Sequence, residues 1–169
     1  AWIFCLLVSG FGPRAGAQSE PRFEISFPAS VHTRSVTGRL FVFIAHTNDV
    51  EPRFQSGEDE LTSPFFGKDV KAWKPGQTAV IDASILGYPP ASLRDIPAGD
   101  YYVQALVNVY SEFHRADGHT IWAHMDQWEG QQFNISPGNL YSEVRRVHLD
   151  AAAGYDVKLE LTKVIPPIK

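Results

Sequence analysis

The residues best suited to chemistry gather in one segment, FHRADGHTIWAHMDQWEG, at positions 113–130. Its imidazoles and carboxylates are types that bind metal ions or transfer protons. His119 and His124 are five residues apart, so on one regular strand they would point to opposite faces. A hairpin turning at Asp117-Gly118 would instead bring His114 and His119 onto one face. The full set is His114, Asp117, His119, His124, Asp126 and Glu129.

Two histidines alone do not make a zinc site, so we expect hairpin and surface roles for this set, with no metal and no cofactor. A metal site and a small enzyme that uses His114 or His119 with Asp117 are the alternatives. The chain contains no G-x-S-x-G, P-loop, H-E-x-x-H or C-x-x-C motif, which are common signals of catalysis or cofactor binding. We therefore expect no catalytic residues in this stretch.

Aromatic residues are interleaved with the same segment. Trp122, Trp128, Tyr110 and Phe113 could form a platform on which a sugar ring stacks. Packing in a core or an interface is the alternative reading, and Trp128, which follows polar Asp126-Gln127, is expected to be the more exposed tryptophan. The predicted ligand or interdomain surface comprises Tyr110, His114, Asp117, His119, Trp122, Trp128 and Tyr141.

The elements that must position these residues read as strands. From Arg22 onward apolar residues recur with period two, and Gly, Pro, Asn and Asp clusters interrupt them. The strongest strand is 101–110, and we expect the others at 23–27, 39–45, 79–82, 144–149 and 157–161. The region 45–79 reads as a surface excursion with at most one short strand. The predicted core stripe of the strongest strand is Tyr101, Val103, Ala105, Val107 and Val109.

This pattern predicts an all-β fold: an antiparallel β-sandwich of seven to eight strands, immunoglobulin-like or jelly-roll, with a small barrel as an alternative. Fifteen Lys and Arg against nineteen Asp and Glu give a net charge of −4, without a basic run. Nucleic acid is therefore not an expected partner.

The first residues resemble an export signal. The apolar run at 1–8 is too short to span a bilayer and leads to Ala15-Gly16-Ala17, a pattern typical of signal cleavage. We expect residues 1–17 to be a truncated signal peptide, so that the mature protein is periplasmic or extracellular and has no membrane segment. A buried first strand is the alternative. Cys5, the one cysteine, lies in this segment, so the exported chain would form no disulfide.

Four stretches together resemble one family: TGRLFVFIA at 37–45, DIPAGDYYVQALVNVY at 95–110, ADGHTIW at 116–122 and SPGNLYS at 136–142. They are similar to the N-terminal region of exported bacterial esterases of the α/β-hydrolase type. In that family a β-rich domain precedes a catalytic domain similar to enterochelin esterases. The resemblance implies that the nucleophile, acid and histidine lie downstream, and no position here matches them.

The expected organisation is therefore a signal at 1–17, a β-sandwich domain at 18–162 and a Pro-rich linker at 163–169 to a downstream domain. Two functions follow as hypotheses. The first is a non-catalytic module that packs on, or targets, the catalytic domain of the same polypeptide. The second is a free-standing carbohydrate-binding or adhesion module whose partner is a polysaccharide.

Overall fold

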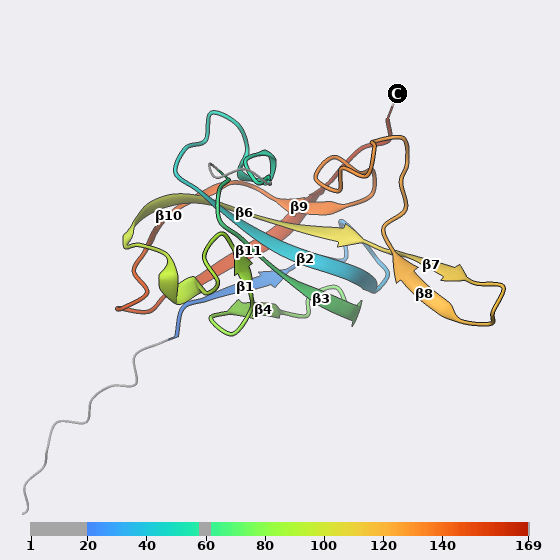
Figure 1. The fold of residues 1–169 in the computed structure, drawn as a ribbon, viewed down its shortest axis with the longest axis horizontal. Helices are drawn as coiled ribbons and strands as arrows, with labels where there is room; N and C mark the ends of the chain where they lie inside the picture. The colour runs from blue at the N-terminus through green and yellow to red at the C-terminus, as the bar shows by residue number, and fades with distance from the viewer. Residues whose placement is uncertain (1–19, 58–61, 169) are drawn as a thin grey trace, which may run out of the picture.

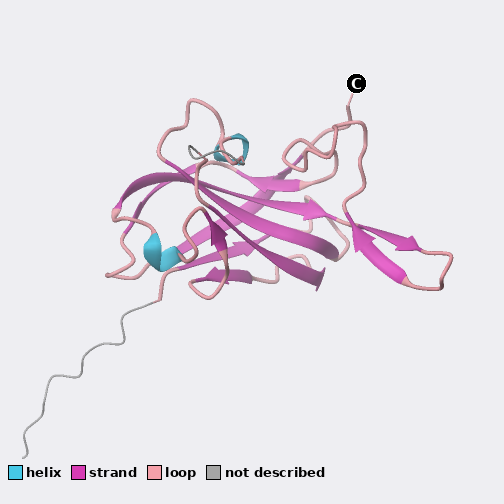
Figure 2. Cartoon of the chain, in the orientation of Figure 1, coloured by secondary structure: helices cyan, strands magenta, loops and turns pink. Residues whose placement is uncertain are grey.

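The computed structural model describes residues 20–57 and 62–168 (Figure 1). The expected signal at 1–17, with Cys5, lies outside the described residues, as does Lys169. Within the described ranges the regular elements are strands and two short 3-10 helices, η1 (Pro52–Phe54) and η2 (Leu93–Asp95) (Figure 2). No helix in this part of the chain is long and apolar enough to cross a membrane. The prediction of an all-β fold is confirmed.

Nine strands form one curled sheet. Its order is β4-β1-β11-β9-β6-β2-β3-β5, and β10 pairs with β6 beside this path. The strands are β1 (Arg22–Ser26), β2 (Val36–Ala45), β3 (Phe65–Trp73), β4 (Ala79–Asp82), β5 (Gly87–Tyr88), β6 (Gly99–Val109), β9 (Leu140–Ser142), β10 (Arg145–Leu149) and β11 (Asp156–Val164). A separate two-stranded sheet contains β7 (Ser111–His114) and β8 (Thr120–Ala123).

The large sheet is mixed, although we expected antiparallel pairing throughout. The first strand, β1, pairs in parallel with the last, β11, from Arg22 opposite Asp156 to Ser26 opposite Glu160. The other pairs are antiparallel. Parallel neighbours need a long crossover, and here the crossover is nearly the whole domain. Periodicity within single strands carries no information about such a pairing.

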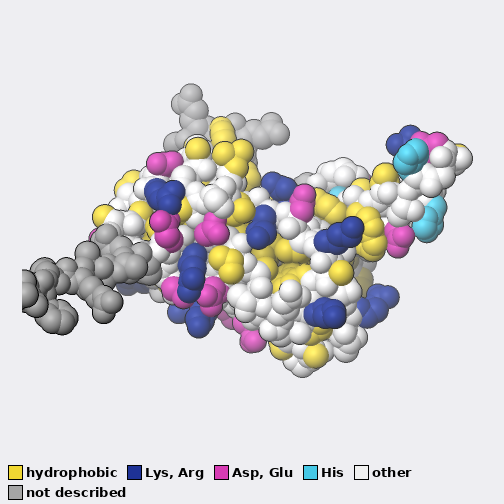
Figure 3. Space-filling view, turned by 90° about the horizontal axis from the view of Figure 1, so that it is seen from below, with side chains coloured by type: hydrophobic (Ala, Val, Ile, Leu, Met, Phe, Trp, Pro, Cys, Tyr) yellow, Lys and Arg dark blue, Asp and Glu magenta, His cyan; other side chains and the backbone are white. Residues whose placement is uncertain are grey.

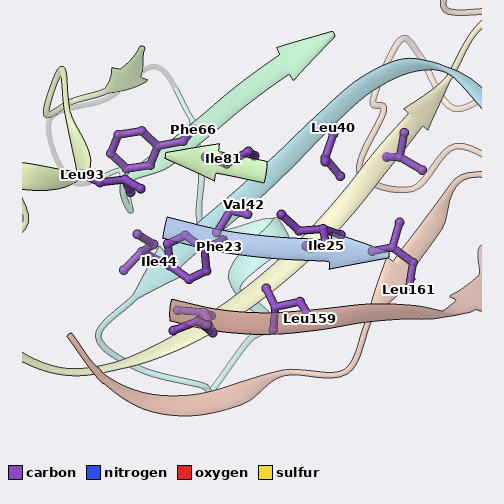
Figure 4. Packing of buried hydrophobic residues seen from close by; sticks show 14 of the residues in the cluster. Phe23, Ile25, Leu40, Val42, Ile44, Phe66, Ile81, Leu93, Leu159 and Leu161 are labelled. Carbon is purple, nitrogen blue, oxygen red and sulfur yellow. The ribbon is translucent and has the colours of Figure 1, made fainter. Parts of the chain in front are cut away.

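The main core fills the inside of the curl. Strands β1, β4 and β11 contribute side chains from one part of the sheet, and β2, β3 and β6 contribute them from the other (Figure 4). The predicted stripe of β6 lies in this core: four of its residues are buried and Val109 is partly buried against them. The fold therefore buries the period-two pattern that the sequence shows.

Strand β2 is buried on both faces, which explains its nearly continuous apolar sequence. Leu40, Val42 and Ile44 face the main core. Phe41 and Phe43 face a second apolar cluster with Leu106 and Ile165. This second cluster is packed against Phe133 and Tyr141, so it links the sheet to the region of the predicted site.

Strand β3 corrects the prediction for 45–79. It is nine residues long and pairs with β2 from Phe65 opposite Phe43 to Trp73 opposite Val36. Gly67, Lys68 and Asp69 interrupt its apolar pattern. Backbone hydrogen bonds to β2 stabilise this strand. The pattern of apolar residues did not predict it, because backbone hydrogen bonds do not depend on side-chain type.

Candidate functional site

The predicted site segment forms a hairpin that projects from the sheet (Figure 1). Strands β7 and β8 pair from Ser111 opposite Ala123 to His114 opposite Thr120. The connection turns at Asp117-Gly118, as predicted: Gly118 has a φ of 83°, and the Asp117 carboxylate accepts the His119 backbone N–H at 3.1 Å. Glycine adopts this backbone conformation without steric cost.

The polar residues at the hairpin tip are exposed and contact their neighbours in sequence (Figure 3). The His114 Nδ1 lies 3.1 Å from the Thr120 hydroxyl. Asp117 lies 3.2 Å from the His119 ring and 3.0 Å from the Arg115 guanidinium. The described residues contain no group of three or more His, Cys, Asp or Glu side chains arranged to hold a metal ion. Because these ion pairs are exposed to solvent, they contribute little to the stability of the fold.

The two faces of the hairpin differ. Glu112 pairs with Trp122, and the next pair, Phe113 with Ile121, points to the opposite face because side chains alternate along a strand. Trp122 is 44% exposed and lines an open groove of about 420 Å³. The half-buried Tyr110 lies in the same groove.

Trp128 lines a different groove, of about 480 Å³. Its side chain is 97% exposed. The two tryptophans therefore do not form one platform. The remaining lining residues of this groove are Met125, Asp126, Gln127, Pro137, Pro167 and Ile168.

A contact at Ser111 connects the Phe113–Ile121 face of the hairpin to the wall of the Trp128 groove. Next to the Phe113–Ile121 pair comes Ser111, whose hydroxyl lies 3.7 Å from the Met125 sulfur in the groove wall. We call the exposed apolar residues along this path the hairpin stripe: Phe113, Ile121, Met125, Trp128 and Ile168. A two-stranded hairpin is marginally stable in water by itself, and contiguous exposed apolar surface is typical of interaction sites.

Tyr141 lies apart from the hairpin stripe. It is half-buried on β9, next to the second apolar cluster. The Arg53 guanidinium lies 4.4 Å from the centre of its ring. The structure thus separates the predicted site residues into the hairpin tip, the Trp122 groove, the Trp128 groove and the sheet at Tyr141.

A polar network lies beneath the Trp128 loop. The Glu129 side chain is fully buried, and one of its oxygens lies 2.6 Å from His124 Nε2. The other ring nitrogen, Nδ1, lies 2.8 Å from the Asn108 side-chain oxygen. His124 and Glu129 belong to the predicted set, but Asn108 and its neighbour Asn139 were not predicted. A loop brings these residues together, and no spacing rule for strands would have found them.

The electrostatics of this network favour an ionised Glu129. Burial opposes the charge, but hydrogen bonds from the Gln127 backbone N–H and from His124 outweigh burial, so the pKa of Glu129 lies below its ordinary value.

Comparisons with known proteins leave the family open. No protein-family model matches the chain, and no match was found among curated proteins or solved structures.

Proposed function

We propose that this chain is a non-catalytic, immunoglobulin-like β-sandwich domain of an exported hydrolase, and that its hairpin stripe docks on the catalytic domain of the same polypeptide. The concentration of exposed apolar side chains at the hairpin and the Trp128 groove carries this proposal. The main core between two parts of the curled sheet supports the sandwich assignment.

The chemistry of the hairpin stripe favours a protein surface as its partner. Aromatic residues and methionine are enriched at the centres of protein interfaces, where charged residues are depleted. The walls of the Trp128 groove are mostly apolar, with Met125, Pro137 and Ile168 among them. Pro167 and Ile168 contribute to this wall, so a domain attached after them would start beside the stripe.

The test begins with the gene beyond the codon for Lys169. We expect it to encode an α/β-hydrolase domain, and a stop codon there would contradict the proposal. The hydrolase domain, produced separately, should bind the 169-residue chain in titration calorimetry. The double variant Phe113→Ser/Ile121→Ser should weaken binding at least tenfold, because it removes the paired apolar side chains that the hairpin contributes to the stripe.

Leu86→Ser is the matched control. Leu86 is 74% exposed, precedes β5 at one end of the sheet order, and lines neither the Trp122 groove nor the Trp128 groove. This variant removes a similar apolar side chain and should bind like the unmodified chain. Equal weakening by both changes, or no weakening by either, would show that the stripe is not the docking surface.

Carbohydrate binding is a second candidate because Asp126 and Gln127 lie beside the exposed indole of Trp128. An indole face with polar side chains at its edge suits a sugar ring. Titration with soluble xylan, dextran and arabinogalactan should then shift tryptophan emission in the chain but not in Trp128→Ala. A flat response to all three would exclude this function for these glycans.

A further inference from the structure

Trp128 occupies a position that neither burial nor backbone preference explains. Its side chain is almost fully in water, and its φ of 79° lies in the left-handed region that favours glycine. The Asp126 carboxylate accepts the Trp128 backbone N–H at 2.9 Å, which closes a local turn. Strained conformations of large residues persist only when the surrounding structure fixes them.

The residue that holds the Trp128 loop in place is Glu129. One carboxylate oxygen accepts the Gln127 backbone N–H at 2.5 Å, and the other lies 2.6 Å from His124. The buried carboxylate thus binds the residue before Trp128 and ties the loop to the end of β8. Glu129 is the one acidic side chain paired with His124 in the described part of the chain.

A chain of hydrogen bonds defines which ring nitrogens of His124 carry protons. The Val109 N–H donates to the Asn139 side-chain oxygen at 2.8 Å, and the Asn139 amide nitrogen donates to the Phe133 carbonyl at 2.7 Å. These two backbone groups fix the orientation of the Asn139 amide, because an N–H only donates and a carbonyl only accepts.

The orientation of Asn139 then fixes Asn108. The Asn139 amide nitrogen also points at the Asn108 side-chain atom that lies 3.3 Å away, so that atom is the acceptor oxygen. The same oxygen faces His124 Nδ1, which must therefore donate. Nε2 faces the Glu129 carboxylate and donates as well. A histidine that donates from both nitrogens is an imidazolium cation.

We propose that His124 is held as a partly buried imidazolium paired with the fully buried Glu129 carboxylate, and that this pair positions Trp128 as the anchor of the docking surface. The anchor role rests on the proposed function; the protonation state of His124 does not. A buried ion pair is often no more stabilising than apolar residues of similar volume, so stability of the fold alone is a weak reason for it.

The protonation state is tested on the chain by itself. In ¹⁵N NMR at pH 7.5, we expect both ring nitrogens of His124 to carry a proton. A ring with one unprotonated nitrogen would overturn the first half of the proposal. Glu129→Gln is the matched variant: it keeps the shape of the side chain but removes the negative charge, so an unprotonated nitrogen should appear on His124.

The positioning role is tested by backbone order at Trp128. Glu129→Gln should lower the heteronuclear NOE of residues 127 and 128 and raise the hydrogen-exchange rate of the Gln127 amide at least tenfold. The resonances of the β1 and β4 amides, which lie outside this network, should stay in place. Unchanged order at Trp128 in this variant would overturn the positioning role. Global unfolding would assign Glu129 to fold stability and overturn it too.

The strain at Trp128 gives a second, independent readout. Trp128→Gly and Trp128→Ala both remove the indole, but only glycine tolerates the positive φ without cost. We expect the folding equilibrium constant of Trp128→Gly to exceed that of Trp128→Ala about fivefold. Both variants should lose at least tenfold in affinity for the hydrolase domain. Equal stability would contradict the strained geometry.

The docking function and the His124–Glu129 ion pair can fail separately. If the chain does not bind a hydrolase domain but His124 is doubly protonated and Glu129→Gln loosens Trp128, the docking function is wrong and the ion pair stands. If the chain binds the domain and Trp128→Ala retains full affinity, the anchor role is wrong and the docking function stands.

Discussion

Two buried tyrosines of the main core differ in what their hydroxyl groups contact. The Tyr101 hydroxyl donates to the Pro97 carbonyl at 2.8 Å. The Tyr155 hydroxyl has no hydrogen-bond partner among the described residues. Burial raises the pKa of the Tyr155 phenol above its ordinary value, so the group stays neutral.

We therefore expect opposite effects from the same substitution. Tyr155→Phe removes an unsatisfied polar group and should leave the free energy of unfolding unchanged or raise it by about 1 kcal/mol. Tyr101→Phe removes the hydrogen bond to Pro97 and should lower the free energy of unfolding by about 1 kcal/mol. Urea unfolding of both variants measures the difference. A loss in Tyr155→Phe as large as in Tyr101→Phe would show that the Tyr155 hydroxyl has a partner.

At the scale of elements, close contact between β2 and β6 aligns the strand that carries Asn108. Gly38 of β2 lies against this strand, opposite Val109. A Cβ atom at Gly38 would lie 2.0 Å from the Asn108 backbone oxygen, which is far inside van der Waals contact. Glycine is therefore required for this pairing, and the register of Asn108 depends on it.

Gly38→Ala should lower the free energy of unfolding by about 1–3 kcal/mol, because one strand must move away from the other. It should also shift the resonances of Asn108 and His124. Gly57→Ala is the control, since a Cβ there meets nothing within 4 Å. Its effect on stability should be small. Equal effects from the two substitutions would argue against the close approach.

At the scale of the whole molecule, acidic groups link stability to pH. The pKa of Glu51 lies below its ordinary value because hydrogen bonds from Gln104 and Arg53 outweigh burial. The pKa of Glu129 is lowered in the same way. Burial, with Arg34 near by, also lowers the pKa of His32. In each case the folded chain binds fewer protons than the unfolded chain at intermediate pH.

The free energy of unfolding should therefore decrease on acidification. The His32 contribution declines as the pH falls through about 6.5 and below, and the Glu51 and Glu129 contributions decline below about 4.5. Urea unfolding between pH 5 and 3, below the ordinary pKa of histidine, measures this dependence. Glu129→Gln should show a shallower decline below pH 4.5. Stability that is constant or increases in this range would contradict the linkage.

The sequence alone determined the class of fold and most strands of the main core. Period-two burial is a local property, so the alternation in β1, β6 and β11 could be read from the chain. The hairpin and its turn at Asp117-Gly118 were also local, because glycine at the tip of a short connection favours that geometry.

The tertiary structure decided the features that depend on distant residues. The parallel pairing of β1 with β11, the length of β3 and the separation of Trp122 from Trp128 arise from how the sheet curls and which strands become neighbours. The network beneath Trp128 depends on the same process. Asn108 and Asn139 reach His124 only after β6, β9 and the connecting loop have packed, since their positions are set by backbone hydrogen bonds across the fold.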